Sequence, residues 1–171
     1  RTAADRLDNI VVIDGLSKSH AMSGWRVGWV VAPIQLTNHL GRFSFMLIFG
    51  TPQFIQDAAA FALNNDEYYV REMRAQYQKR RDLVCARLAQ MPRLSYLTPE
   101  SGMFIMVNIS AFFKDDKEFA QKLLDAEKLS VLPGSAFGAG TTGHIRISLV
   151  QPEDVLSEGC NRLERFLKAL S

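Results

Sequence analysis

The sequence feature that most constrains the fold is a helical pattern that continues for about six turns. From residue 67 to residue 90 the apolar side chains keep a spacing of three to four residues, with arginines and glutamines on the other faces. The stretch of chain before this helix and the stretch after it differ in pattern. We therefore place a boundary between two domains inside the helix, near residue 75, so that the domains cover residues 1–75 and 76–171.

The first of these regions begins with two short strands and continues with helices. The β-branched stretches at residues 10–13 and 27–31 are bounded by glycine or proline and are predicted to be buried strands. A helical pattern follows from Pro33 to about Ile48. A second helix is predicted to run to about Leu63, with Thr51 as its N-cap and the following proline at its first position.

The second region alternates strands and helices, which predicts an α+β arrangement within an α/β protein. Asp115 followed by Glu118 resembles a capping box for a helix that runs to about Glu127. A last amphipathic helix follows Pro152. Strands are predicted at residues 94–97, 103–109, 129–132 and 144–149.

Charge and cysteine content argue against several classes of partner. The chain has 20 Lys+Arg against 18 Asp+Glu, which gives no field that favours nucleic acid or an anionic membrane. No apolar stretch reaches the about 20 residues that a membrane span needs. Cys85 and Cys160 lack a CxxC spacing and the chain has 3 His, so we expect free thiols in a reducing cytoplasm and no metal site. The start at Arg1 lacks an initiator Met and a signal core, so we expect a piece of a longer protein.

Lys18 is the first candidate for chemistry. It is the only lysine in the first 78 residues, and it lies just past a predicted strand, where loops deliver catalytic groups from a rigid scaffold. A partly desolvated lysine amine can attack a carbonyl carbon and form a Schiff base. The alternative is an ordinary solvated lysine in a loop.

The residues around this lysine favour the first interpretation. Ser17 and Ser19 flank it with hydroxyl groups, and Gly15 and Gly24 allow a close approach of the backbone. Arg26 offers a planar fork of donors that suits a phosphate. An aldehyde that carries a phosphate would satisfy all of these groups.

This loop resembles a known signature. Its sequence is Leu-Ser-Lys-Ser-His-Ala-Met-Ser-Gly-Trp-Arg-Val-Gly, residues 16–28, and it is similar to the cofactor-lysine motif of the class I/II aminotransferases, which are fold-type I pyridoxal-phosphate enzymes typified by aspartate aminotransferase. The resemblance implies that Lys18 forms the internal aldimine with pyridoxal phosphate and that Arg26 binds its phosphate. It also places Ser17 and Gly15 at the cofactor, although many members have serine where this chain has Gly15.

A second signature lies near the C-terminus. The stretches Val-Leu-Pro-Gly-Ser-Ala-Phe-Gly, residues 131–138, and His-Ile-Arg-Ile-Ser, residues 144–148, resemble the loop and strand whose arginine holds the substrate's α-carboxylate. That role would fall to Arg146. From the residues alone, an arginine in an apolar strand indicates either a cleft that binds an anion or a salt bridge on an edge strand.

The resemblance covers essentially the whole chain but only the C-terminal part of such an enzyme. It implies the end of the large-domain sheet, a long connecting helix and a small α+β domain. It further implies amino acid and 2-oxo acid substrates, a homodimer, and a carboxylate for the pyridine nitrogen that would precede Arg1; Asp5, Asp8 and Asp14 are too close to Lys18 to match it. We therefore expect this piece alone to be inactive and, with apolar faces uncovered, to associate.

Substrate choice and reaction type stay open. The dicarboxylic subclass has a side-chain-binding arginine in the stretch that matches residues 43–51, where this chain has none; Arg42 is adjacent but off the pattern. The sequence looks most like the arginine–pyruvate transaminase branch. Two alternatives remain, since fold does not fix reaction: a C–S lyase or decarboxylase-like enzyme, and a non-catalytic effector domain of a transcription regulator.

Overall fold

The computed structural model describes residues 9–170, which form two compact units. One unit ends at Glu72 and the other begins at Met73, within the long helix α4 (Asp66–Leu88). The long helix predicted from residue 67 to residue 90 is therefore confirmed. That these units correspond to two domains of a longer enzyme, with a boundary near residue 75, stays a prediction. No helix among the described residues is long and apolar enough to cross a membrane.

The first unit begins with a two-stranded antiparallel sheet. Strand β1 (Val12–Gly15) pairs with β2 (Gly28–Val31). The prediction that these strands are buried was wrong for this chain, since Ile13 is 79% exposed and Val30 is 43% exposed. The physical reason is that the described chain pairs only two strands here and supplies no further layer to cover them.

Two short turns connect these strands. They are α1 (Leu16–Ser19) and the 3₁₀ turn η2 (Ser23–Trp25). Leu16 is fully buried, and its carbonyl accepts hydrogen bonds from the backbone N–H groups of His20 and Met22. The connection between the strands therefore consists of two helical turns that are held in place by one buried leucine.

Two helices complete the first unit ahead of α4. Helix α2 (Ile34–Ile48) begins after Pro33, as predicted, and α3 (Gln53–Asn64) follows. The expectation that Thr51 is the N-cap of α3 was wrong. Pro52 occupies that position with an extended ψ of 142°, so the helix begins one residue later than predicted.

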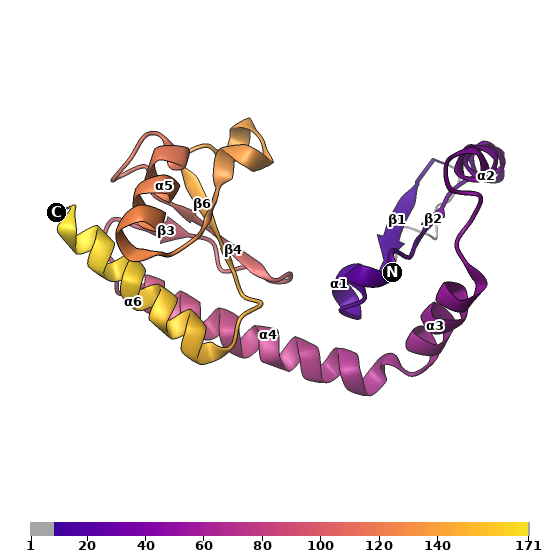
Figure 1. The fold of residues 1–171 in the computed structure, drawn as a ribbon, viewed down its shortest axis with the longest axis horizontal. Helices are drawn as coiled ribbons and strands as arrows, with labels where there is room; N and C mark the ends of the chain where they lie inside the picture. Colours follow the sequence, from indigo (N-terminus) through magenta and orange to yellow (C-terminus); the bar gives the residue numbers. More distant parts are fainter. Residues whose placement is uncertain (1–8, 171) are drawn as a thin grey trace. The chain divides into compact units, whose positions relative to one another are not determined.

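The second unit is built on a four-stranded antiparallel sheet with the strand order β3-β4-β6-β5 (Figure 1). The strands predicted at residues 94–97, 103–109 and 144–149 are present in shorter form, whereas the strand predicted at residues 129–132 shares only Leu132 with β5. Their bounds are β3 (Ser95–Tyr96), β4 (Phe104–Asn108), β5 (Leu132–Pro133) and β6 (His144–Ser148).

Helices pack on one face of this sheet. They are the C-terminal part of α4, α5 (Asp116–Glu127) and α6 (Glu153–Ala169), with α4 and α6 side by side (Figure 1). The side chains of alternate strand residues point toward the helices and form the core. The fully buried members include Ile105, Val107, Ile145, Phe119 and Leu123.

The predicted cap of α5 is confirmed. The Asp115 side chain accepts hydrogen bonds from the backbone N–H groups of Lys117, at 2.8 Å, and Glu118, at 3.3 Å. The side chain of Glu118 instead pairs with Lys122 along the helix. The helix thus begins where the sequence indicated.

Candidate functional site

A pocket of about 520 Å³ lies at the end of the β1–β2 pair where residues 16–27 connect the two strands. Its lining includes the four predicted cofactor residues of this unit, Gly15, Ser17, Lys18 and Arg26, together with Asp14 and Ser19. Residues from the end of one strand, the helical turn after it and the start of the next strand therefore meet around one space.

The two cations of this pocket have no carboxylate partner. Neither Lys18 nor Arg26 forms an ion pair with any residue between 9 and 170. The Asp14 carboxylate, which also lines the pocket, accepts a hydrogen bond from the Gly15 N–H at 2.7 Å. Because neither Lys18 nor Arg26 is neutralised by a carboxylate of residues 9–170, the pocket suits an anion.

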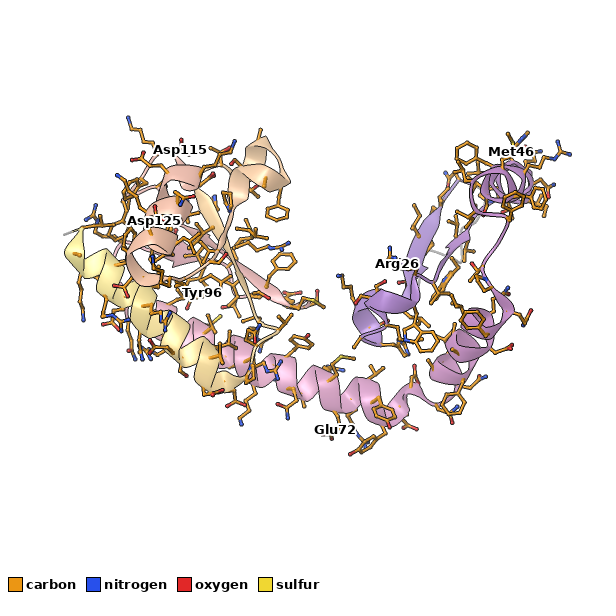
Figure 2. All side chains as sticks on the ribbon, viewed as in Figure 1. Arg26, Met46, Glu72, Tyr96, Asp115 and Asp125 are labelled. Carbon is orange, nitrogen blue, oxygen red and sulfur yellow. The ribbon has the colours of Figure 1, made fainter. Side chains whose placement is uncertain are left out.

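Arg26 has an unusual backbone conformation. Its φ of 53° and ψ of 44° lie in the left-handed region, which is uncommon for a residue with a side chain. The Arg26 Nη1 donates to the carbonyl of Ser23 at 2.8 Å. Figure 2 labels Arg26 beside the strands of this unit. The local turn thus fixes part of the guanidinium and leaves the remaining donors to the pocket.

Two glycines set the distance between the strands at this pocket. Gly15 and Gly28 are cross-strand partners. A Cβ on Gly15 would lie 2.9 Å from the carbonyl oxygen of Val27, and a Cβ on Gly28 would lie 2.7 Å from that of Asp14. The close approach expected at Gly15 is therefore made to the neighbouring strand. A Cβ on Gly24 would meet nothing within 4 Å, so the close approach expected there is absent.

His20, which the sequence gave no reason to select, is packed next to the lysine turn. Its Nδ1 is hydrogen-bonded to Ser19 Oγ at 2.8 Å, and its Nε2 lies 3.6 Å from the Asp66 carboxylate at the start of α4. The His20 side chain is 10% exposed. The imidazole therefore links the lysine turn to the helix, a tertiary contact that residue spacing does not reveal.

The remaining predicted residue, Arg146, belongs to the second unit. It lies on β6 and shares the sheet face of Phe104, the face opposite the helices. Its guanidinium carbon is 4.4 Å from the ring centroid of Phe137 and 5.2 Å from that of Phe104. The alternative of a salt bridge on an edge strand is wrong, since β6 lies between β4 and β5 and Arg146 forms no ion pair within residues 9–170.

One further polar residue of the second unit was missed. Asp116, the first residue of α5, is 1% exposed, and its carboxylate accepts hydrogen bonds from Ser135 and Gly143. Burial by itself would raise the pKa of this carboxyl group, but the hydrogen bonds from Ser135 and Gly143 outweigh it and hold the pKa below its ordinary value of 3.8. In the sequence it is only the second of two acidic residues at a helix start.

The cysteines contribute no reactive group. Cys85 and Cys160 are both free and buried, and burial raises the pKa of each thiol. Among residues 9–170, no group of three His, Cys, Asp or Glu side chains is placed to hold a metal ion.

Several known proteins are similar to this chain in sequence. Residues 1–163 match the protein family described as aminotransferase class I and II. The chain is 46% identical over 156 residues to an arginine–pyruvate transaminase of Pseudomonas aeruginosa. This match covers 91% of this chain and 40% of that protein. It is 34% identical over 163 residues to an aspartate aminotransferase of Pyrococcus horikoshii, covering 94% and 42% of the two chains.

A solved structure shows the same arrangement of elements. The aromatic aminotransferase from Pyrococcus horikoshii superposes with a TM-score of 0.90 at 36% identity, covering 94% of this chain and 44% of that one. The chain therefore spans about two fifths of the length of the relatives that it matches.

Proposed function

This chain belongs to the class I and II aminotransferase family, and we propose on that basis that it carries the cofactor lysine of an enzyme that transfers an amino group from an amino acid to a 2-oxo acid. One observation carries the proposal: Lys18 and Arg26 line the same pocket, and neither is paired with a carboxylate of the described chain. The fold is that of the C-terminal part of a fold-type I enzyme.

The residues of this pocket fit pyridoxal phosphate, which members of this family use. The cofactor has an aldehyde, which suits the Lys18 amine, and a phosphate, which suits the free guanidinium donors of Arg26. Ser17 would add a hydroxyl donor, and Gly15 permits the close pairing of β1 and β2 at the pocket. When bound, the cofactor would supply an electron sink for the negative charge that develops at the substrate's Cα.

Lys18 would have a second task in the reaction. The Lys18 Nζ would accept the proton from the substrate's Cα and pass it on as a general acid–base. A side chain with no ion pair in the described chain is free to do both.

Arg146 would bind the substrate's α-carboxylate. A guanidinium presents a planar set of N–H donors that matches a carboxylate with two parallel hydrogen bonds. The rings of Phe137 and Phe104 lie near the guanidinium carbon, and no carboxylate of the described chain neutralises it. An exposed sheet face with one unpaired cation beside two aromatic rings suits an organic anion.

The complete enzyme is proposed to be a cytoplasmic homodimer, and the 171-residue chain alone to be inactive. Helix α2 has no buried residue, and its exposed side chains include Phe43, Phe45 and Met46. We propose that in the complete enzyme the remaining part of the subunit and the partner subunit cover this helix. Light scattering should then show self-association of the 171-residue chain, and a dilute monomer would contradict this.

Arginine and pyruvate are the proposed substrates. The identity of 46% with the arginine–pyruvate transaminase supports them, as does the lack of an arginine within residues 43–51. A panel of amino donors assayed with pyruvate on the complete enzyme tests this, and a strong preference for aspartate would contradict it. Keto acid production, as opposed to release of ammonia, separates transamination from C–S lyase chemistry.

Reductive trapping tests the cofactor proposal directly. The complete enzyme is incubated with pyridoxal phosphate, reduced with borohydride and mapped by peptide mass spectrometry. We expect the label on Lys18, its loss in Lys18→Ala, and weaker labelling in Arg26→Ala. Lys79→Ala is the matched control, because Lys79 is exposed and paired with Glu153 at 2.9 Å. A label spread evenly over all lysines, or absent from Lys18, would overturn the proposal.

A further inference from the structure

Phe137 reaches Arg146 from a loop rather than from the sheet. It lies in the segment between β5 and β6, residues 134–143, in the 3₁₀ turn η3 (Gly134–Phe137). Its ring is 48% exposed, so no core packing fixes it. The position of this ring over the guanidinium therefore depends on what holds the loop.

The loop is closed on itself by Thr141. The Thr141 hydroxyl donates to the carbonyl of Gly134 at 2.7 Å and lies 2.9 Å from that of Gly138. Gly134 is packed so tightly that a Cβ there would lie 2.1 Å from the Thr141 carbonyl oxygen and 2.8 Å from that of His144. The loop thus forms a compact unit, with its two ends in contact.

Asp116 attaches both ends of this unit to helix α5. Its Oδ2 accepts from the backbone N–H of Ser135, at 3.1 Å, and from that of Gly143, at 2.9 Å. Its Oδ1 accepts from the Ser135 hydroxyl at 2.6 Å. Asp116 is also the one buried polar or charged side chain of residues 9–170, and its position in the first turn of a helix favours a negative charge. A buried carboxylate is costly unless such donors satisfy it.

We propose that Asp116 is a positioning residue for Arg146: by fixing the loop at Ser135 and Gly143, it holds the Phe137 ring against the guanidinium. With that ring and the Phe104 ring near its guanidinium carbon, Arg146 is left to offer its N–H edge to a planar carboxylate. The functional part of this inference rests on the proposed role of Arg146 in carboxylate binding.

The test measures the position of the Phe137 ring in the intact chain by NMR. The Phe137 ring current changes the chemical shifts of the Arg146 side-chain protons. The Phe137→Leu variant gives the chemical shifts in the absence of this ring. Asp116→Ala leaves the Ser135 and Gly143 donors without an acceptor, so the Arg146 shift should move most of the way to the Phe137→Leu value.

Two variants separate positioning from a general loss of stability. Asp115→Ala removes the neighbouring N-cap, which costs about 1 kcal/mol of helix stability. The Asp115 side chain accepts hydrogen bonds from Lys117 and Glu118 of its own helix, so the Arg146 shift should stay. Asp116→Asn should restore the shift, because the amide oxygen can accept from both N–H groups while the amide nitrogen donates to the Ser135 hydroxyl.

The outcomes are distinct. A folded Asp116→Ala variant that keeps the wild-type Arg146 shift overturns the proposal, and so does an Asp115→Ala variant that loses it equally. Should Asp116→Ala fail to fold, Ser135→Ala decides: it removes one of the three hydrogen bonds and should give a partial loss, whereas an unchanged shift overturns the proposal.

A titration with pyruvate separates this inference from the proposed function. We expect pyruvate to move the Arg146 signals of the wild-type chain, with a dissociation constant about threefold to tenfold larger in Asp116→Ala. If pyruvate leaves the wild-type signals unchanged while Asp116→Ala has lost the ring shift, the role of Arg146 in binding carboxylates is wrong and its positioning by Asp116 stands.

Discussion

The two units differ in how much apolar surface they bury. Within residues 9–72 only Leu16 and Ala59 are buried apolar residues. The second unit has a continuous core that joins the sheet to α4, α5 and α6, with Phe119 in edge-to-face contact with Phe113 and Phe166. Burial of apolar surface is the main source of folding free energy. Of the two units, only the second has the hydrophobic core that an independent domain needs.

The proposed functional residues of the two units therefore differ in the structure that supports them. Arg146 lies on a sheet whose other face is packed within its own unit. Lys18 and Arg26 lie at the end of a two-stranded sheet, which by itself is only marginally stable in water. The proposed carboxylate site is therefore supported by the core of its own unit, whereas little of the described chain covers the proposed cofactor pocket.

Hydrogen exchange on the intact chain gives the largest expected difference. Backbone amides of β4, β6 and α6 should be protected by about 5 kcal/mol or more, the stability range of a small domain. Amides of β1, β2 and α2 should exchange with almost no protection, because so little apolar surface is buried around them. Mass spectrometry of peptides from exchanged samples measures both at once. Equal protection of the amides in the two units would contradict the conclusion that the units differ in stability.

A matched pair of phenylalanine substitutions sharpens the comparison. Phe119→Ala removes a fully buried ring from the core and should lower the free energy of unfolding of the second unit by about 3–5 kcal/mol. Phe45→Ala removes a ring that is 62% exposed on α2 and should change stability by less than about 0.5 kcal/mol.

Urea denaturation distinguishes the units because both tryptophans, Trp25 and Trp29, are in the first one. Tryptophan fluorescence follows the first unit alone, and circular dichroism follows the helices of both units, so a transition seen by circular dichroism without a change in fluorescence reports the second unit. A large effect of Phe45→Ala, comparable to that of Phe119→Ala, would show that α2 packs into a core that the structure does not contain.

Local patterns predicted the elements well where neighbours along the chain decide the structure. The spacing of apolar residues located α4 and α6, and Asp115 marked the start of α5. The burial of β1 and β2 was predicted wrongly for a tertiary reason. A β-branched run indicates a strand that can be buried, but whether it is covered depends on strands that belong to other parts of the sheet.

The same distinction holds for the site. The loop of residues 15–28 could be selected from sequence because Lys18, Ser17 and Arg26 are close along the chain and converge on one pocket. Asp116 could not, since its partners Ser135 and Gly143 are 19 and 27 residues away and no spacing rule joins them. Sequence reasoning thus identified the groups proposed to touch the ligand and missed the group that holds their surroundings.

The smallest expected effect is a dependence of second-unit stability on acid pH, through Asp116. Hydrogen bonds from Ser135 and Gly143 keep the pKa of Asp116 below 3.8 in the folded chain, against the effect of burial, with a smaller attraction from Lys117. A carboxyl group whose pKa is lowered by folding contributes stability that is complete above the unfolded pKa and is lost as the pH falls through the folded pKa. The loss should therefore lie below about pH 4.

Asp116→Asn isolates this contribution, because the amide keeps the shape of the side chain but does not titrate. Urea denaturation followed by circular dichroism at a series of pH values from about 6 to about 2 should show a steeper fall for the wild-type chain than for Asp116→Asn. The carboxylates Glu158 and Glu164, whose pKa values are lowered mainly by hydrogen bonds from Arg162 and Lys168, titrate in both proteins, so their effects cancel in the difference. Parallel curves would mean that the Asp116 carboxylate is held no more favourably in the second unit than in the unfolded chain. The greater stability expected of the second unit would then come from apolar packing alone.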